Sequence, residues 1–399
     1  MKVNTDAAKI KEILERGVED VIVKEHLEAA LTSGTQLRVK FGIDPTAPDV
    51  HVGHTVPLRK LRAFQELGHH VVLLIGDFTA KIGDPSGRNE ARKPLTDADV
   101  KKNMEGYLAQ AGKIVDVKEA EIVYNSTWFE RENIAKMLEL ASAGSMQQVL
   151  RRAEFKKRLD EGSDITTLEV LYPLFQGYDS VVIQADVEIG GTDQLFNLLM
   201  GRRVQRHYEM PEQDVLTTQL LEGTDGAKKM SKSVGNYIGL SEESNAMFSK
   251  VMSVPDALIL KYFWLCTDVT QDELDAHEKR MSEGANPKDI KIELGKKIVA
   301  LYHSRTAADD AAQEFEKVFS KKELPSEVAE YRISANPFSI IDVMLAAGLA
   351  DSRGEAKRLV EQGGVTVNDA VVRDWTEPVA WNDGDVLKAG KRNFIRIKL

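Results

Sequence analysis

Five consecutive apolar residues at 71–75, Val-Val-Leu-Leu-Ile, constrain the fold of this chain more than any other short segment. A continuous apolar run of this length is typical of a strand that is buried on both faces, as in a parallel sheet covered by helices. Residues 37–44 alternate in side-chain type, and residues 55–67 between the two segments have helical apolar spacing. Strand, helix and strand in this order predict βαβ units, and therefore an α/β fold with a parallel sheet.

The remaining patterns predict more than one domain, as expected for a chain of 399 residues. Residues 180–189 and 215–221 are predicted to be further strands, and residues from about 96 to 159 a mainly helical, charged insertion. Residues 245–320 follow a helical pattern throughout. Two prolines and little apolar periodicity then indicate a linker, after which the chain predicts two short helices and several strands.

Composition narrows the class of protein. The single cysteine, Cys266, excludes an internal disulfide framework and any multi-cysteine zinc site, and a small buried apolar role suits it. No apolar run approaches the length of a membrane span, and the first residues lack the apolar core of a signal peptide, so we expect a cytoplasmic protein. The net charge of -10 argues against non-specific coating of nucleic acid, although a basic face can lie on an acidic protein.

The segment from Asp44 to His54 follows a predicted strand and enters a predicted helix. A helix N-terminus offers free N–H groups to an anion, and Gly53 allows a ligand to approach closely. His51 and His54 lie three residues apart on one helical face and can donate to phosphate oxygens. A metal pair is a weaker interpretation, because neither an HExxH pattern nor a third ligand is evident. Two polar surface histidines at a helix start remain an alternative for this motif alone.

A second segment, Lys229-Met230-Ser231-Lys232-Ser233, lies in a polar, glycine-containing loop. Its lysines and hydroxyls can surround a polyphosphate, although such a run is ordinarily a solvated loop. This pentapeptide resembles the KMSKS signature of class I aminoacyl-tRNA synthetases, and residues 51–54 resemble their HIGH signature with Val in place of Ile. A given pentapeptide appears by chance in a chain of this length with odds on the order of 10⁻⁴, and the two segments occur in the family's order.

The resemblance implies a Rossmann-like catalytic domain and activation of an amino acid by ATP. A carboxylate attacks the α-phosphorus in line, so the protein must position the reactants and offer positive charge to the leaving pyrophosphate. Magnesium should accompany the ATP phosphates, and no tightly bound protein metal is expected. The candidate catalytic residues are His51, His54, Lys229 and Lys232. The candidate ATP-binding residues are Thr46, Gly53, Gly191, Asp193, Met230, Ser231, Ser233, Arg88 and Arg92, of which the two arginines have an equal claim to being exposed loop charges.

The stretch from Tyr172 to Asp179 indicates which amino acid is activated. On a helix Tyr172, Gln176 and Asp179 share a face, which could also be a polar face turned to solvent. The stretch resembles the Tyr-x-x-x-Gln-x-x-Asp pattern of tyrosyl-tRNA synthetases, in which Tyr and Gln hold the amino end and Asp accepts from the phenol. Residues 83–87 and 190–194 match that family's GDPSG and GG-[ST]-D-Q segments. The candidate tyrosine-binding residues are Lys40, Gly42, Asp44, Asp84, Tyr172, Gln176, Asp179 and Gln194.

Lys40 departs from the other branch of that family, which has a Tyr at this position. Strand alternation places Lys40 on the same face as Gly42 and Asp44. The resemblance puts Gly42 and Asp44 at the substrate, so Lys40 should point the same way. A buried lysine needs a partner, and we predict Asp179 as that partner. Alternatively, the long stem of Lys40 could carry its charge to solvent, in which case the residue only packs.

Residues 352–358 and 364–368 resemble segments of the small α-L RNA-binding domain, and residues 286–291 resemble the anticodon-side helix of tyrosyl enzymes. The candidate RNA-binding residues are Asn286, Asp289, Lys291, Arg353, Lys357 and Arg358. The resemblance implies tRNA(Tyr), L-tyrosine and ATP as partners, and a homodimer formed through the insertion. The predicted domains are a Rossmann-like catalytic domain at 1–244 with a helical insertion at about 96–159, a helical anticodon-side domain at 245–320, a linker at 321–337 and an RNA-binding module at 338–399.

Three other functions remain as alternatives. A tryptophanyl-type enzyme is the nearest, but the Tyr, Gln and Asp on one helical face favour a phenol. A non-catalytic RNA-binding paralogue would have no need of both signature segments intact. A small-molecule adenylyltransferase would leave the terminal RNA-binding module unexplained.

Overall fold

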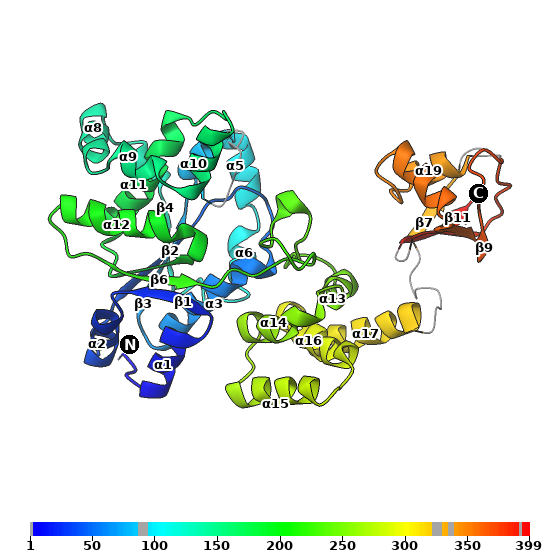
Figure 1. Ribbon diagram of the computed structural model, residues 1–399, viewed down its shortest axis with the longest axis horizontal. Coiled ribbons are helices and arrows are strands. Elements are labelled where there is room, and N and C mark those ends of the chain that lie inside the picture. Colours follow the sequence, from blue (N-terminus) through cyan, green and yellow to red (C-terminus); the bar gives the residue numbers. More distant parts are fainter. Residues whose placement is uncertain (1–2, 87–94, 321–328, 334–338, 391–392) are drawn as a thin grey trace. The chain divides into compact units, whose positions relative to one another are not determined.

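The computed structural model covers residues 1–399 and describes residues 3–86, 95–320, 329–333, 339–390 and 393–399. The chain forms two compact units, Met1–Ala311 and Ala312–Leu399 (Figure 1). Each unit has its own sheet, so each is described by itself.

The first unit is built on a six-stranded sheet, as the parallel α/β pattern predicts. Its strands, in spatial order, are β1 (Val18–Ile22), β6 (Asp214–Thr218), β5 (Val187–Gly191), β2 (Arg38–Ile43), β3 (His70–Ile75) and β4 (Glu121–Tyr124). All neighbouring pairs are parallel except β1 and β6, which are antiparallel. No sequence pattern predicts β1, whose mixed polar residues suit an edge strand.

Helices cover both faces of this sheet. In Figure 1 the sheet separates α11 (Thr167–Ile183) and α12 (Leu195–His207) from α1 (Ala7–Glu15), α2 (Lys24–Ser33) and α3 (Val52–Glu66). This explains why residues 71–75 of β3 are all buried and why β2 is buried at Val39, Lys40 and Phe41 in succession. A strand covered on both sides has no solvent face, so polar residues on it need partners inside the protein.

Two predicted boundaries are wrong. Residues 180–183 end α11, and the strand that was expected at 180–189 begins only at Val187. A short run of β-branched residues cannot be assigned to a strand or a buried helix from periodicity alone. Residues 96–159 are mostly helical, but they also contain β4, which pairs with β3 in the main sheet and is therefore not part of a separate insertion. The helices between β3 and β5, besides α11, are α4 (Thr79–Ile82), α5 (Asp97–Met104), α6 (Tyr107–Ala111), α7 (Ser126–Phe129), α8 (Ile134–Ser142), α9 (Met146–Leu150) and α10 (Ala153–Asp160).

The helical stretch after residue 244 is as the pattern predicts. Its helices are α13 (Ser244–Met252), α14 (Ile259–Cys266), α15 (Gln271–Ser282), α16 (Pro287–Tyr302) and α17 (Arg305–Phe315). Asn286 caps α16 by accepting from the Lys288 backbone N–H, and Pro287 occupies the first helical position, where its missing N–H costs nothing. Cys266 is fully buried at the end of α14.

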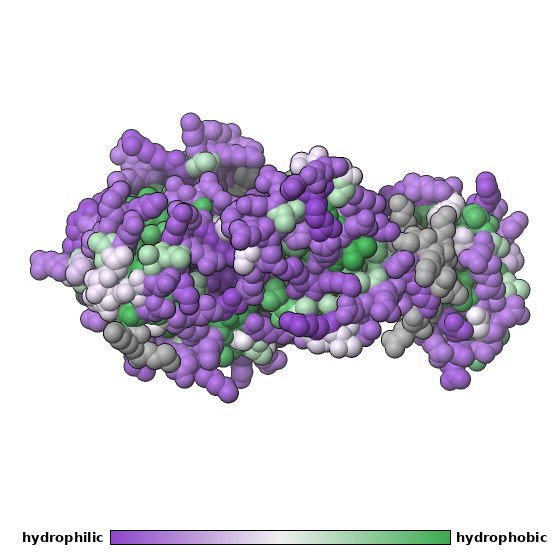
Figure 2. Space-filling view, turned by 90° about the horizontal axis from the view of Figure 1, so that it is seen from below, coloured by the Kyte–Doolittle hydropathy of each residue, from purple (hydrophilic) through white to green (hydrophobic). Residues whose placement is uncertain are grey.

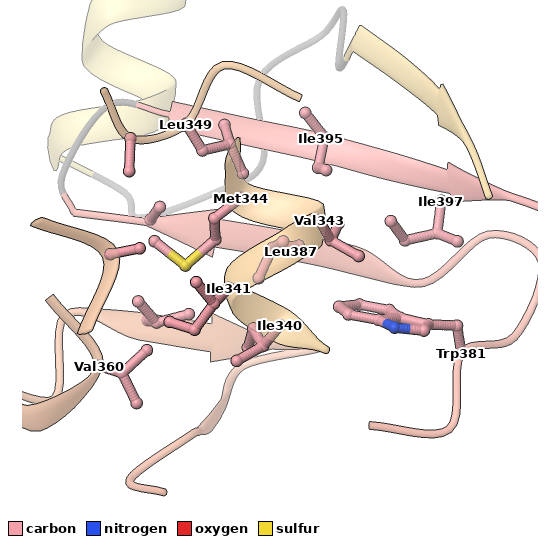
Figure 3. Close-up of a cluster of buried hydrophobic side chains, with 14 of the residues drawn as sticks. Ile340, Ile341, Val343, Met344, Leu349, Val360, Trp381, Leu387, Ile395 and Ile397 are labelled. Carbon is pink, nitrogen blue, oxygen red and sulfur yellow. The ribbon is translucent and has the colours of Figure 1, made fainter. Parts of the chain in front are cut away.

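The second unit has a five-stranded sheet of order β7-β11-β10-β8-β9 covered by α18 (Ile340–Ala346) and α19 (Arg353–Glu361). The strands are β7 (Ala329–Arg332), β8 (Val365–Val367), β9 (Ala370–Val371), β10 (Val386–Ala389) and β11 (Asn393–Lys398). The prediction that residues 321–337 form a linker is therefore wrong for β7, which pairs parallel to β11 at the sheet edge. Figure 3 shows the core of this unit, whose labelled members include Ile341, Met344, Val360, Trp381, Leu387 and Ile395.

The surface of the protein is mainly hydrophilic, in agreement with the negative mean hydropathy of the sequence. The face in Figure 2 is mainly hydrophilic, with small hydrophobic patches among the hydrophilic residues. Among the described helices, none combines the length and the apolar character that crossing a membrane requires.

Candidate active site

A large open pocket of about 970 Å³ lies in the first unit, where the carboxyl ends of β2, β5 and β6 meet. Ligands of open α/β sheets bind at this edge of the strands. Of the predicted catalytic, ATP-binding and tyrosine-binding residues, all but Arg88 and Arg92 line the pocket. Arg88 and Arg92 lie outside the described residues.

The N-terminus of α3 forms one wall. His51 precedes the first residue of the helix, and the His51 backbone N–H donates to His54 Nδ1 at 3.3 Å. The neutral His54 ring therefore carries its proton on Nε2, which can donate to a ligand oxygen. A Cβ at Gly53 would lie 3.1 Å from His51 Nδ1, so glycine lets the imidazole lie against the backbone.

Both histidines are neutral at ordinary pH. Burial, together with the nearby charges of Lys232 and Lys229, lowers the pKa of His51 to about 3. Burial also holds the pKa of His54 well below its usual range, and the neighbouring His51 ring adds to this effect. The two imidazoles can therefore donate hydrogen bonds to phosphate, but they do not supply the positive charge that sequence analysis expected of them.

Positive charge near the N-terminus of α3 comes from the loop that follows β6. Lys229 Nζ lies 2.5 Å from Asp193 Oδ2, and Lys232 donates to the backbone oxygen of Asp49. Burial lowers the pKa of Lys232, while Asp49 opposes that shift. Met230 is buried, and its Sδ accepts from the Gly53 backbone N–H at 3.3 Å, which fixes the loop against the start of α3.

Helix α11 supplies the opposite wall. Tyr172 Oη donates to Asp44 Oδ2 at 2.9 Å, which joins α11 to the end of β2. Gln194 Nε2 donates to Asp84 Oδ2 at 2.6 Å, so these two candidates also contact each other. Two carboxylates and a phenol thus surround this part of the pocket, an arrangement suited to a substrate ammonium group.

Asp179 lies deeper on α11 and is almost completely buried. Trp128 Nε1 donates to its Oδ1 at 3.0 Å, and Asn125 Nδ2 approaches its Oδ2 at 3.4 Å. Burial raises the pKa of Asp179 to about 7, against the opposing effect of the Lys40 charge. Trp128 and Asn125 carry no sequence signal for this role, because nothing in their local pattern separates them from ordinary residues of a strand–helix turn.

Lys40 points toward the pocket as predicted, but the predicted partner is wrong. Lys40 Nζ forms an ion pair with Glu188 Oε1 at 2.9 Å rather than with Asp179, and both side chains of the pair are buried. It also donates to Ser180 Oγ at 2.8 Å and to the Gln176 backbone oxygen at 3.0 Å. The alternative in which its stem reaches solvent is also wrong, since Lys40 has no exposed surface.

The RNA-binding candidates lie outside the pocket. Lys291 Nζ forms an ion pair with Asp256 at 2.6 Å, and its side chain is largely buried. In the second unit Arg353 begins α19 and contacts Asp342, while Lys357 Nζ lies 3.8 Å from the ring centroid of Trp375. Asn286 and Asp289 lie at the exposed N-terminus of α16, and Arg358 is exposed on α19.

Comparison with known proteins identifies similar chains along nearly the whole length. The family profile described as tRNA synthetases class I (W and Y) matches residues 32–320, and the S4 domain profile matches residues 341–379. A tyrosine–tRNA ligase of Thermotoga maritima is 48% identical over 386 residues, which is 96% of this chain and 96% of that protein. A tyrosine–tRNA ligase of Carboxydothermus hydrogenoformans is 46% identical over 400 residues, 97% of each chain.

Solved structures share the fold of the first unit. The tyrosyl-tRNA synthetase of Archaeoglobus fulgidus, solved with L-tyrosine, superposes with a TM-score of 0.63 at 21% identity, over 77% of this chain and 100% of that chain. A C-terminally truncated mitochondrial tyrosyl-tRNA synthetase of Aspergillus nidulans gives a TM-score of 0.66 at 22% identity, over 78% and 94% of the two chains.

Proposed function

Because this chain belongs to the bacterial tyrosyl-tRNA synthetases, a class I family, we propose that its pocket activates L-tyrosine with ATP and transfers it to tRNA. The observation that carries this proposal is that one pocket is lined both by the two signature segments and by Tyr172, Gln176 and Asp179 of α11. A nucleotide-binding wall and an amino-acid-binding wall then face the same space, as a reaction between ATP and an amino acid requires.

In the first step the tyrosine carboxylate oxygen attacks the α-phosphorus, and the bond between that phosphorus and the pyrophosphate oxygen breaks. Lys229 and Lys232 would stabilise the negative charge that develops on the pyrophosphate. His51 and His54 would donate to phosphate oxygens as neutral rings, as their lowered pKa values require. Asp193 would hold the ribose once Lys229 moves from it to the phosphates.

In the second step a hydroxyl of the 3′-terminal ribose of tRNA attacks the tyrosine carbonyl, and AMP leaves. Throughout both steps Asp84, Tyr172 and Gln176 would hold the ammonium end of tyrosine. Asp179 would accept from its phenol. These contacts are supported by the position of each residue in the pocket and by the resemblance of their segments to the family's patterns.

Magnesium would enter with ATP. The phosphate side of the pocket is lined by lysines and histidines rather than by a cluster of carboxylates, which suits binding of a MgATP complex through its phosphate oxygens. Among the residues that the structure describes, no three His, Cys, Asp or Glu side chains are grouped as metal ligands. When bound, the ion would neutralise phosphate charge.

The S4 domain of the second unit would contact tRNA. Arg353, Lys357 and Arg358 on α19 supply positive charge of the kind that binds phosphates, and the neighbouring Trp375 offers an aromatic face. The N-terminus of α16, with Asn286 and Asp289, would lie on the anticodon side. Lys291 fits this role less well, because it is already paired with Asp256.

The proposal also includes a cytoplasmic location and a homodimer. The homodimer is supported by exposed apolar residues on α8 and its neighbours. On α8, Ile134 and Leu138 have 79% and 68% of their surface exposed, and they lie one helical turn apart on the same face. Met146 of α9 and Leu168 of α11 are also exposed, so this region presents apolar surface that a second copy could cover. Sedimentation velocity of an Ile134→Asp, Leu138→Asp variant would test this, since a dimer formed elsewhere would survive both substitutions.

Amino-acid-dependent exchange of pyrophosphate into ATP tests the central proposal. Each of the twenty amino acids is assayed with the purified full chain, and tyrosine should support exchange far above the rest. Exchange with tryptophan instead would favour the alternative enzyme, and no exchange with any amino acid would favour the non-catalytic RNA-binding paralogue.

A further inference from the structure

Glu188 lies beneath the pocket as the centre of a buried polar network that the signature segments do not include. Only 1% of its side chain is exposed. Its Oε1 accepts from Gln176 Nε2 at 3.1 Å and pairs with Lys40 Nζ at 2.9 Å. Its Oε2 accepts from Ser180 Oγ at 3.1 Å and from Gln213 Nε2. Four donors around one carboxylate give both oxygens hydrogen-bond partners.

This network determines which way the Gln176 amide is turned. Gln176 Nε2 donates to Glu188 Oε1, so the amide presents its NH₂ group to the carboxylate. The carbonyl oxygen then lies at the opposite corner of the amide, and Gln176 lines the pocket. If residue 188 could donate, the amide could turn and present NH₂ to the substrate instead.

Lys40 reinforces the same geometry. Its ammonium joins Glu188 of β5 to the Gln176 backbone oxygen and to Ser180 Oγ on α11. The Gln176 backbone and side chain are therefore both held by one ion pair, which leaves the residue little freedom to rotate. Such an arrangement would be unnecessary if Gln176 only filled space.

We propose that Glu188 is a positioning residue that turns the Gln176 amide so that its carbonyl oxygen accepts a hydrogen bond from the ammonium group of the amino-acid substrate. This rests on the proposed function, in which Gln176 contacts the amino end of tyrosine. Glu188 itself does not line the pocket and acts only through Gln176.

The experiment compares two ligands that differ only in the ammonium group. L-Tyrosine and 3-(4-hydroxyphenyl)propionate are titrated calorimetrically into the wild-type protein and a Glu188→Gln variant. Tyrosine should bind about 10-fold or more weakly to the variant, because an ammonium that meets NH₂ loses a charge-assisted hydrogen bond. Binding of the deaminated acid should change less than 2-fold, since it makes no such bond.

Glu169→Gln is the matched control. Glu169 of α11 also forms a buried ion pair, with Arg158 at 2.6 Å, and it lies outside the pocket. This variant should lose stability but keep the wild-type ratio of the two affinities. If Glu188→Gln does not fold, the Lys40→Met, Glu188→Gln variant removes both charges together and leaves no unpaired buried ion, so the comparison is made there.

Two results would overturn the inference. Equal weakening of both ligands would mean that Glu188 only supports the fold, and unchanged affinity for both ligands would mean that the Gln176 amide does not depend on it. Failure of the wild-type protein to bind or activate tyrosine would instead contradict the proposed function, so the two failures are distinguishable.

Discussion

The imidazole rings of His51 and His54 are stacked, with centroids 3.6 Å apart and planes inclined by 16°. Two protonated rings at this distance would repel each other strongly, and His51 is buried, so water screens such a charge poorly. Within the part of the chain that the structure describes, the buried His51 Nδ1 has no hydrogen-bond partner. The pair is therefore arranged as two neutral donors, and the lysines carry the charge of the site.

The first prediction concerns stability at acidic pH. The pKa of His51 is about 3 in the folded protein against 6.5 for the free side chain, so the unfolded chain binds more protons between these values. The stabilisation is present above pH 6.5 and is lost as the pH falls toward 3, with a slope of up to about 1.4 kcal/mol per pH unit. Urea unfolding of wild type and His51→Asn between pH 7.5 and 5 should show a shallower loss for the variant. Parallel curves would mean that His51 is protonated in the folded protein.

The second prediction concerns the leaving pyrophosphate. Lys232→Ala should slow tyrosyl-adenylate formation by about 100-fold or more while tyrosine affinity changes little, because the lysine acts on charge that develops in the transition state. Stopped-flow fluorescence separates the rate from the binding step. Lys11→Ala, an exposed substitution on α1, is the control. A normal rate of adenylate formation with weakened tyrosine binding would mean that Lys232 contributes to substrate binding and not to the transition state.

The third prediction concerns phenol recognition by Asp179. Because its pKa is raised to about 7, the carboxylate is ionised only above that pH, and kcat/KM for tyrosine should fall as the pH drops through 7. Asp179→Asn should remove this pH dependence and shrink the tyrosine-to-phenylalanine ratio of kcat/KM by about 10-fold or more. Steady-state pyrophosphate exchange with both amino acids measures the effect. A ratio that survives the substitution would place phenol recognition elsewhere.

The fourth prediction concerns the buried ion pair. Lys40→Met leaves Glu188 buried without its counter-charge and should cost about 3–5 kcal/mol of unfolding free energy. The Lys40→Met, Glu188→Gln variant removes both charges and should recover most of that loss. Urea unfolding of both single variants and the double variant completes a mutant cycle. Additive losses would show that the two residues do not interact in solution.

The fifth prediction concerns the second unit. A chain ending at Ser320 should fold and form tyrosyl-adenylate but charge tRNA poorly, because it lacks the S4 domain. Ending at Pro337 would instead leave β7 without β11, its partner in the sheet, and expose an unpaired strand. Both half-reactions are measured in one preparation of the shorter chain. Equal charging by the short and full chains would contradict an RNA-binding role for the second unit.

The signature segments and the main periodicities could be predicted from the sequence because each depends on neighbouring residues. The apolar run of β3, the helical face of Tyr172, Gln176 and Asp179, and the cap at Asn286 are local features. The carboxyl ends of parallel strands lie at one edge, so a pocket joining the two signature segments follows from the strand order.

Only the tertiary structure determined the partners of the charged groups and the pairing of the strands near the sheet edges. Lys40 forms its ion pair with Glu188 rather than with Asp179 because β5 lies beside β2 in the sheet. No local sequence pattern contains this neighbour relationship. The lowered pKa of His51 depends on burial and on the charges of Lys232 and Lys229, which are distant from it in sequence. β4 and β7 form strands because each pairs with a strand distant in sequence. Periodicity determines which face of an element is apolar, whereas the partner of a charged group or an edge strand depends on contacts made only when the chain has folded.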